Sequence, residues 1–273
     1  MSRVDLHLHT RYSDGSWTPD SLCREAARQE LASIAVTDHD TLDGVAETMA
    51  AGQYYGVEVI PAVEVTCRVG VKEIHLLGYL PGNAWQDAAL HAVLEHSKHI
   101  REKRVHDMVA ALNELGIAIT TADVFAGSDC GTVGRPHVAL ALIKRGVVRT
   151  KEEAFERFLK RGKPGFVERY RMEAVEAIGH LKRAGGLAVL AHPALNKIDD
   201  DIPMLVQQGL AGLEIWHSRH SAGQMEHYRK IAQRLELLVT GGSDCHGSAH
   251  GRILIGSVDV PYECVTALRA KLT

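Results

Sequence analysis

The sequence lacks the features of a disulfide-bonded or membrane-spanning protein. Its five cysteines are odd in number and form no Cys-x-x-Cys pair, which argues against a disulfide framework and against a thiolate zinc site. The longest apolar runs are far too short to cross a bilayer. The first residues, Met-Ser-Arg-Val-Asp-Leu-His, contain no apolar signal core. We therefore expect a cytoplasmic protein that has no membrane partner.

An excess of positive charge is also missing. The chain has 31 lysines and arginines against 34 aspartates and glutamates, so that its formal net charge is -3 at pH 7, with an isoelectric point near 6.6. Without a basic field, tight binding to long duplex DNA is not expected. A small anionic substrate would need a local basic pocket. The sequence leaves the oligomeric state open.

Short apolar, β-branched runs alternate with longer stretches of helical period along most of the 273 residues. This alternation is typical of repeated βα units around a parallel sheet, so we expect an α/β fold. The expected strands are 4–8, 33–36, 57–63, 73–79, 187–191, 213–216 and 237–240. The stretch 253–258 is either an eighth short strand or an edge.

The middle of the chain differs, because its expected helices have no convincing strands between them. A long helical stretch at about 87–115 is dense in His, Arg, Lys and Glu, and further helices are expected at 135–144 and 152–160. We interpret 100–167 as a small helical insertion into a β/α domain that comprises 1–99 and 168–273. Such an insertion would be able to cap the rim of the domain.

Imidazoles and carboxylates stand at the ends of most expected strands. His7 and His9 are two residues apart in a strand, so both project to one side, and the same parity joins Asp244 to His246. Because the carboxyl ends of parallel strands meet at one rim, we expect these side chains to converge. The nine candidate metal ligands are His7, His9, Asp14, His39, Glu64, His75, His192, Asp244 and His246.

Packing alone does not explain this set, because burying so much polarity without a counter-ion would be costly. Nine side chains exceed what one tetrahedral ion requires, so we expect two or three divalent ions, with Glu64 as the bridge between a pair. Imidazole and carboxylate ligands without a thiolate suit Mn²⁺, Zn²⁺ or Fe²⁺. The residues therefore predict a metallohydrolase.

The order and spacing of these motifs resemble those of the polymerase and histidinol phosphatase (PHP) superfamily. The resemblance covers the whole chain and rests on His7-Leu-His9, Ser13-Asp14-Gly15, Thr37-Asp38-His39-Asp40, Glu64, His75, Ala191-His192-Pro193 and Gly242-Ser243-Asp244-Cys245-His246. It implies a distorted (β/α)7 barrel with a trinuclear metal site at its carboxyl-terminal rim, used for phosphoester hydrolysis. Mn²⁺ is the ion that we expect first.

The resemblance also implies how the ligands divide among the ions. One ion would be held by His7, His9, Glu64 and Asp244. A second would be held by Glu64, His75 and His192, and a third by Asp14, His39 and His246. Beside these ligands, Asp38 is a candidate to support them from a second layer, and Asp40 is equally able to cap the following helix.

A narrower branch of the superfamily also looks similar. It contains bacterial proteins that dephosphorylate 3',5'-nucleoside bisphosphates, some of which also trim short 5'-phosphorylated RNA. The matching segments are Arg101-Glu-Lys-Arg104, Gly134-Arg135-Pro-His137, Gly162-Lys-Pro164 and Glu214-Ile-Trp-His217-Ser. The resemblance implies loss of the 3'-phosphate from a substrate such as adenosine 3',5'-bisphosphate, which gives AMP and phosphate. Small nucleotides, and at most short RNA, would be the partners.

Two groups of residues are expected to act on such a substrate. The catalytic candidates are His192, Asp244 and His217, of which His192 or His217 would help the ribose oxygen to leave. Arginine forks and a helix N-terminus match phosphate oxygens, so the 5'-phosphate would be held by Arg101, Arg104, Arg135 and His137. Charge spacing alone equally allows Arg101 and Arg104 to form a solvated helix face.

Three other functions remain open at this point. The same metal motifs would serve a histidinol phosphate phosphatase. An exonuclease that trims 5'-phosphorylated oligoribonucleotides is another possibility, limited to short substrates because the chain has no basic stripe. A non-catalytic metal-binding module is the third, and the completeness of the ligand set speaks against it.

Overall fold

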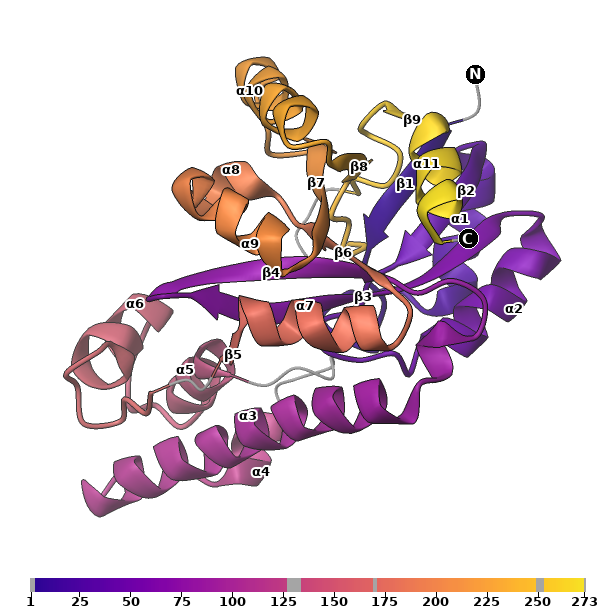
Figure 1. Ribbon diagram of the computed structural model, residues 1–273. Coiled ribbons are helices and arrows are strands. Elements are labelled where there is room, and N and C mark those ends of the chain that lie inside the picture. The colour runs from indigo at the N-terminus through magenta and orange to yellow at the C-terminus, as the bar shows by residue number, and fades with distance from the viewer. Residues whose placement is uncertain (1–2, 127–133, 169–170, 249–252, 273) are drawn as a thin grey trace. The chain divides into compact units, whose positions relative to one another are not determined.

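The structure, a computed structural model, describes residues 3–126, 134–168, 171–248 and 253–272 (Figure 1). The chain divides into two compact units. We call Met1–Leu94 with Arg171–Thr273 the barrel unit, and Glu95–Tyr170 the helical unit. Within the described ranges, no helix combines the length and the apolar character that crossing a membrane would require.

The barrel unit is built on one sheet of nine strands. Their order is β8 (Leu238–Gly242), β7 (Leu210–His217), β6 (Leu187–Leu190), β4 (Lys72–Tyr79), β3 (Glu58–Val69), β2 (Leu31–Val36), β1 (Arg3–Leu8) and β9 (Val260–Pro261), while β5 (Met172–Glu173) pairs with β3. The sheet nearly closes, because Leu8 forms a parallel bridge with Cys245, just after β8. The expected distorted (β/α)7 barrel is confirmed.

Most neighbouring strands run parallel, but β4 does not. Only Gly70 and Val71 connect it to β3, and Gly70 has a φ of +58°. So short a connection joins antiparallel strands, whereas a parallel pair needs a long crossover. β4 is also antiparallel to β6. The expectation that 73–79 belongs to a parallel βα repeat is therefore wrong, and this strand distorts the barrel.

Helices follow most strands of the barrel unit along the chain (Figure 1). They are α1 (Pro19–Arg28), α2 (Val45–Tyr55), α7 (Ala174–Arg183), α8 (Pro193–Asn196), α9 (Ile202–Gln208), α10 (Ala222–Arg234) and α11 (Glu263–Leu272), with the 3-10 turns η1 (Ala84–Gln86) and η3 (Asp199–Asp201). Alternation along β3 shows how they pack. Val63 and Val65 join Ile178 and Leu181 of α7 in the core, whereas Glu64 projects to the other side.

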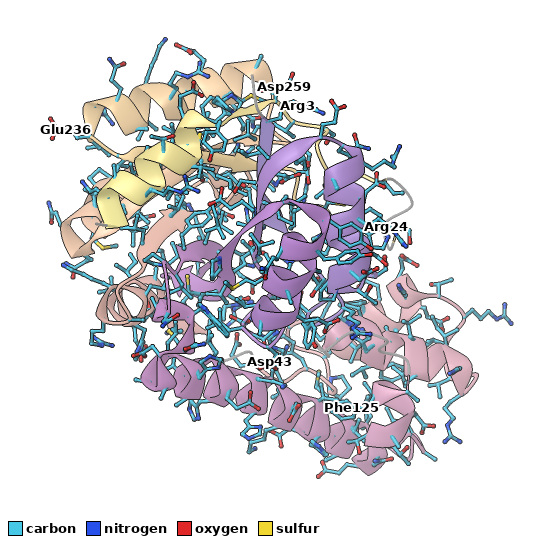
Figure 2. The ribbon with its side chains drawn as sticks, turned by 90° about the vertical axis from the view of Figure 1, so that its right-hand side faces the viewer. Arg3, Arg24, Asp43, Phe125, Glu236 and Asp259 are labelled. Atoms are coloured by element: carbon cyan, nitrogen blue, oxygen red, sulfur yellow. The ribbon has the colours of Figure 1, made fainter. Side chains whose placement is uncertain are left out.

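The amino end of β1 is closed by β9. Arg3 pairs with Pro261 in an antiparallel register, and Figure 2 shows Arg3 and Asp259 at the same end of the barrel unit. The Arg3 guanidinium donates hydrogen bonds to the carbonyl oxygens of Gly256 (3.1 Å) and Gln29 (2.8 Å). The edge strand thus lies after 253–258, which contains no strand, and the carboxyl end of β1 is left for the site.

The helical unit has a core of its own. It contains most of α3 (Ala88–Glu114), which begins in the barrel unit, followed by α4 (Thr121–Phe125), α5 (Arg135–Lys144), α6 (Lys151–Ala154) and the π-turn η2 (Phe155–Leu159). Met108 and Leu112 of α3 are fully buried in one cluster with Val138 and Leu142 of α5. Packing of amphipathic helices therefore stabilises this unit without a strand among its described residues.

Candidate metal centre

The nine expected ligands gather at the carboxyl-terminal rim of the barrel unit. His7 lies in β1, with His9 and Asp14 after it; His39 follows β2; Glu64 lies in β3 and His75 in β4; His192 follows β6; Asp244 and His246 follow β8. His75 stands only three residues after the start of β4. It reaches this rim because β4 is antiparallel and begins where β3 ends.

The Glu64 carboxylate lies at the centre of the cluster and is 1% exposed. Its Oε2 atom is 3.2 Å from the Nε2 atoms of His7 and His9, and 3.1 Å from His39 Nδ1. Its Oε1 atom is 2.8 Å from His75 Nδ1 and 3.1 Å from His192 Nε2. One carboxylate therefore faces five imidazoles. His7 and His9 come from the same strand end, and each of the other three comes from a different one.

Asp244 forms a second side of the cluster. Its Oδ1 atom lies 3.4 Å from His7 Nε2 and 3.2 Å from His9 Nε2, while Oδ2 lies 3.4 Å from His217 Nε2. The residue has a φ of +57°, a left-handed conformation that aspartate tolerates better than most side chains do. Glu64 and Asp244 thus contact the same two histidines from two directions.

Asp14 lies at the outer edge of the cluster, with 38% of its side chain exposed. Its Oδ1 atom is 3.2 Å from His246 Nε2, and its Oδ2 atom is 3.7 Å from His39 Nε2. Burial by itself would raise the pKa of Asp14, but the His246 contact and the nearby His39 and His9 hold it well below its usual range. A carboxylate that stays ionised is suited to a cation.

Among the described residues, the ligand atoms form groups of the size that holds one ion. Within each group all atoms lie within 4.8 Å of one another, and the groups are His9, Asp14, His39 and His246; His7, His9, Glu64 and Asp244; His39, Glu64 and His75; and His7, Glu214 and His217. The set of His7, His9, Glu64 and Asp244 that the resemblance implied for one ion recurs unchanged. The set of Asp14, His39 and His246 implied for another recurs with His9 added. In the set of Glu64, His75 and His192 implied for the remaining ion, His192 reaches the same Glu64 oxygen as His75.

Three buried nitrogens without hydrogen-bond partners among the described residues indicate that a cation fits here. His7 Nε2, His9 Nε2 and His39 Nδ1 make no hydrogen bond of normal geometry within the described ranges, although each lies close to a carboxylate oxygen. Buried polar atoms are rarely left unsatisfied in native proteins. Nitrogens and carboxylate oxygens that converge without bonding to one another fit divalent ions placed between them.

The pKa values of two neighbouring imidazoles in the cluster, His9 and His39, are shifted in opposite directions. Burial lowers the pKa of His9, but the facing carboxylates of Asp244 and Glu64 outweigh burial and raise it to about 10. For His39, burial prevails over the attraction of Glu64 and lowers the pKa to about 4. Without metal, positive charge at His9 therefore takes the place that a cation would occupy, and His39 stays neutral.

A second layer of side chains holds these residues in place. Asp38 Oδ1 accepts hydrogen bonds from the Thr10 N–H (2.7 Å) and the Ser13 hydroxyl (2.6 Å), and its Oδ2 accepts one from the Thr10 hydroxyl (2.6 Å). Asp38 thus fixes the loop that carries Asp14. Asp40 instead accepts from the Thr66 N–H (2.8 Å), and α2 begins later, so the capping alternative is wrong.

Glu214 is a site residue for which sequence reasoning predicts no role. It lies in β7, is fully buried, and contacts the His7 ring and the His192 backbone. Its signal in the sequence is an acidic residue between Leu213 and Ile215, inside the otherwise apolar expected strand 213–216. A carboxylate in such a strand needs buried partners, which is the observation that would have drawn attention to it.

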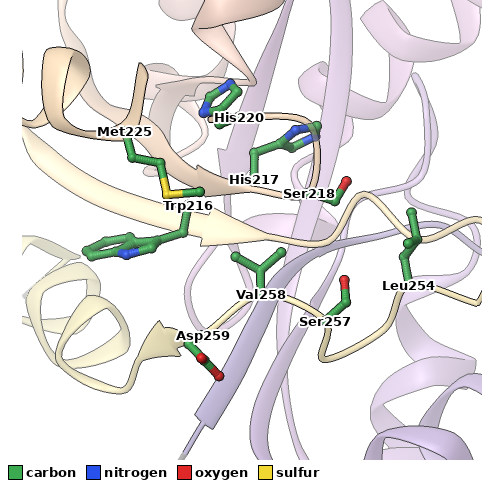
Figure 3. A pocket seen from close by; sticks show the side chains of 9 residues that line it. All are labelled: Trp216, His217, Ser218, His220, Met225, Leu254, Ser257, Val258 and Asp259. Carbon is green, nitrogen blue, oxygen red and sulfur yellow. The ribbon is translucent and has the colours of Figure 1, made fainter. Parts of the chain in front are cut away.

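His217, a catalytic candidate, ends β7 and is 1% exposed. Its Nδ1 atom accepts a hydrogen bond from the Arg219 N–H (3.1 Å), so in the neutral ring the proton is on Nε2. That Nε2 atom faces Asp244 Oδ2. His217 also lines a pocket of about 430 Å³ together with Trp216, Ser218, His220, Met225, Leu254, Ser257, Val258 and Asp259 (Figure 3).

The four residues expected to hold a phosphate belong to the helical unit, whereas the nine expected ligands belong to the barrel unit. Arg104 is 7% exposed, and its Nε donates to the Val167 carbonyl (2.9 Å). Arg135 begins α5 with its guanidinium over the rings of Phe155 and Phe166, and His137 Nδ1 accepts from the Gly134 N–H. Arg101 lies on α3. Their role in phosphate binding stays a prediction.

Comparisons with a family model and with known proteins agree on one family. Residues 5–159 match the family model of the PHP domain. The chain is 32% identical to a 3',5'-nucleoside bisphosphate phosphatase of Chromobacterium violaceum over 97% of its own length and 94% of that protein. It is 30% identical to a 5'-3' exoribonuclease of Haemophilus influenzae over 89% and 90% of the two chains.

Solved structures agree with this family. A crystal structure from Bifidobacterium adolescentis, titled as that of a metal-dependent phosphoesterase, superimposes with a TM-score of 0.81 at 30% sequence identity. The match covers 99% of this chain and 96% of that one. The likeness therefore extends over nearly the full length of both chains.

Proposed function

The chain belongs to the PHP family of metal-dependent phosphoesterases, and we propose that it removes the 3'-phosphate from 3',5'-nucleoside bisphosphates. It is a hydrolase that acts on phosphoesters. The observation that carries the finer proposal is the 32% identity, over nearly the full length of both chains, to a relative with this name. Adenosine 3',5'-bisphosphate would then give AMP and phosphate.

The reaction needs divalent ions, and the cluster around Glu64 would hold them. We propose two or three, with Mn²⁺ first and Zn²⁺ or Fe²⁺ as alternatives, because the donors are imidazoles and carboxylates without a thiolate. Bound ions would supply an activated water near neutral pH and offset the charge of the phosphoryl oxygens. Glu64 would bridge two ions, since its two oxygens face different sets of histidines.

His217 is the residue that we propose as the proton donor to the leaving ribose oxygen. Its Nδ1 is occupied by the Arg219 N–H, so that Nε2 carries a proton toward the Asp244 side of the cluster. The pocket beside it gives room for the organic part of the ester (Figure 3). His192 fits a ligand role better than a proton-donating role, because its Nε2 faces Glu64 at 3.1 Å.

The 5'-phosphate would be bound by the helical unit, through Arg101, Arg104, Arg135 and His137. Arg135 and His137 stand in the first turn of α5, where backbone N–H groups attract an anion. Gly134 before them adopts an extended conformation and its N–H already bonds to His137, which orders this turn. Binding of this second phosphate would distinguish a bisphosphate from a simple monoester.

The test is a comparison of substrates with purified, Mn²⁺-loaded protein. We expect phosphate release from adenosine 3',5'-bisphosphate at a kcat/KM at least about 100-fold above that for histidinol phosphate, since histidinol phosphate has no second phosphate to make charged contacts with the arginines. A reversed preference would identify a histidinol phosphate phosphatase. A metal-replete protein that hydrolyses none of these substrates would point to a non-catalytic module.

Trimming of short 5'-phosphorylated RNA is a second candidate activity, and the similarity to the H. influenzae exoribonuclease favours it. A 5'-phosphorylated oligoribonucleotide of three to five residues is the substrate to add to the assay. We expect slow release of single nucleotides and no degradation of long duplex DNA, because the chain has no net positive charge. The cytoplasm is the compartment in which we expect this activity.

A further inference from the structure

The Glu214 carboxylate connects two candidate ligands that come from different strands. Its Oε1 atom lies 2.9 Å from His7 Nδ1, and its Oε2 atom accepts a hydrogen bond from the His192 backbone N–H at 2.7 Å. His7 belongs to β1, His192 follows β6, and Glu214 lies in β7. The carboxylate is fully buried, so both contacts are shielded from water.

The contact with His7 selects which ring nitrogen faces the cluster. A carboxylate accepts only, so His7 must carry a proton on Nδ1 to satisfy Glu214. In the neutral ring the free lone pair is then on Nε2, which points toward Glu64 (3.2 Å) and Asp244 (3.4 Å). A ligating histidine that donates its other N–H to a carboxylate is fixed in both tautomer and orientation.

The contact with His192 holds an unusual backbone. His192 has φ +31° and ψ +56°, a left-handed conformation that is costly for a residue with a Cβ atom. The residue caps the N-terminus of α8, which begins at Pro193 directly after it. Glu214 accepts the N–H at this point, which stabilises the backbone that turns the His192 ring toward Glu64.

An alternative is that Glu214 is itself a metal ligand, since it groups with His7 and His217. Three contacts argue against this. Both of its oxygens already accept hydrogen bonds, and His217 Nδ1 accepts from the Arg219 N–H. Glu214 therefore acts on the ligands and not on the ions.

We propose that Glu214 is a positioning residue that couples two metal sites, by orienting His7 for one and His192 for another. This inference rests on the proposed function, in that the two histidines hold different ions. A single carboxylate would then set the affinity of both sites together. Outer partners of this kind change metal affinity about 10- to 100-fold when they are replaced.

The test compares Glu214→Gln with Glu226→Gln, an exposed glutamate on α10 that serves as the matched control. An amide has one acceptor oxygen, so Gln satisfies one N–H donor and turns its own NH₂ toward the other. Metal content by mass spectrometry and Mn²⁺ titration calorimetry give the readout. We expect Glu214→Gln to weaken two of the sites together by about 10- to 100-fold, and the control to bind like wild type.

Binding of Mn²⁺ by Glu214→Gln with wild-type stoichiometry and affinity would overturn the proposal. A merely structural role would lower the melting temperature and leave the affinity of the folded protein unchanged, which would overturn it as well. Should the variant fail to fold, ¹⁵N NMR of histidine-labelled wild type loaded with diamagnetic Zn²⁺ decides. The proposal expects His7 with its proton on Nδ1, and a proton on Nε2 refutes it.

These outcomes separate the inference from the proposed function, because the metal measurements use no nucleotide. A wild-type chain that binds the ions but leaves the bisphosphate intact would refute the substrate and keep the role of Glu214. A Gln variant with unaltered metal binding would refute the role of Glu214 and keep the substrate.

Discussion

His75 Nδ1 lies 2.8 Å from Glu64 Oε1, although the two residues stand on strands that run in opposite directions. The contact exists because β4 turns back from β3 through two residues, so that its first residues lie beside the carboxyl half of β3. His75 would have been at the opposite rim in a parallel strand. The direction of one strand thus completes the ring of imidazoles around Glu64.

Replacement of Glu64 by glutamine should abolish the metal centre. The amide has no charge and leaves several buried imidazoles without a counter-ion. We expect Glu64→Gln to lose at least one ion per chain and to release phosphate at least about 100-fold more slowly, as metal content and kcat/KM will show. Glu58→Gln, on the same strand and partly exposed, is the control. Full metal content in the Glu64 variant would contradict the bridging role.

Metal binding should release protons from the protein. The pKa of His9 is raised to about 10 in the metal-free arrangement, so this ring carries a proton at pH 7 that a cation must displace. Apparent Mn²⁺ affinity should therefore rise with pH from 6 to 8. Calorimetry in two buffers of different ionisation enthalpy counts the protons, and we expect about one or more per chain. A pH-independent affinity with no proton release would count against His9 as a ligand.

Replacing His217 should lower kcat more for a substrate with a basic leaving group than for one with a good leaving group. A general acid contributes about 10²- to 10⁴-fold to the departure of a basic oxygen, and little to that of p-nitrophenolate. We expect His217→Gln to lower kcat on the nucleotide by about that factor, with kcat on p-nitrophenyl phosphate and metal content near wild type. His99→Gln, an exposed histidine on α3, is the control. Equal losses on both substrates would exclude proton donation.

Arg135 should determine the preference for a second phosphate. We expect Arg135→Ala to raise KM for adenosine 3',5'-bisphosphate by about 10-fold or more, because a charge-assisted contact is lost, while KM for a simple monoester changes little. Lys144→Ala, which removes an exposed charge at the other end of α5, is the matched control. An Arg135 variant that loses both activities equally would indicate that the residue stabilises the helical unit, where it packs against Phe155 and Phe166.

Gly242 should be intolerant of any side chain. A Cβ atom there would lie 2.4 Å from His7 Cβ, where β8 approaches β1. We expect Gly242→Ala to lower the free energy of unfolding by about 1–3 kcal/mol in urea titrations and to weaken metal binding, because His7 must move. Gly223→Ala, in α10 with open space around its Cβ, should change stability by less than about 1 kcal/mol. Equal stability of the two variants would contradict this account of the strand contact.

Much of the architecture could be predicted because hydrophobic periodicity is local. The seven expected strands all occur in the sheet, with bounds that differ by up to six residues, as where 57–63 becomes Glu58–Val69. The two-residue parity of His7 and His9 also holds, since both rings face Glu64. Strand direction and the edge strand were missed, because they depend on pairing between segments far apart in the chain.

The sequence by itself determined which residue types would be available to the site: an uninterrupted set of imidazoles and carboxylates, in the order of a known family, at the ends of short apolar runs. These features depend only on residue identity and spacing along the chain. Only the tertiary structure decided that five imidazoles face one carboxylate, that His75 reaches their rim, and that Glu214 contacts both His7 and His192. The physical reason is that spacing fixes the side of a strand on which a residue projects, whereas contact between strands depends on register, direction and closure of the whole barrel.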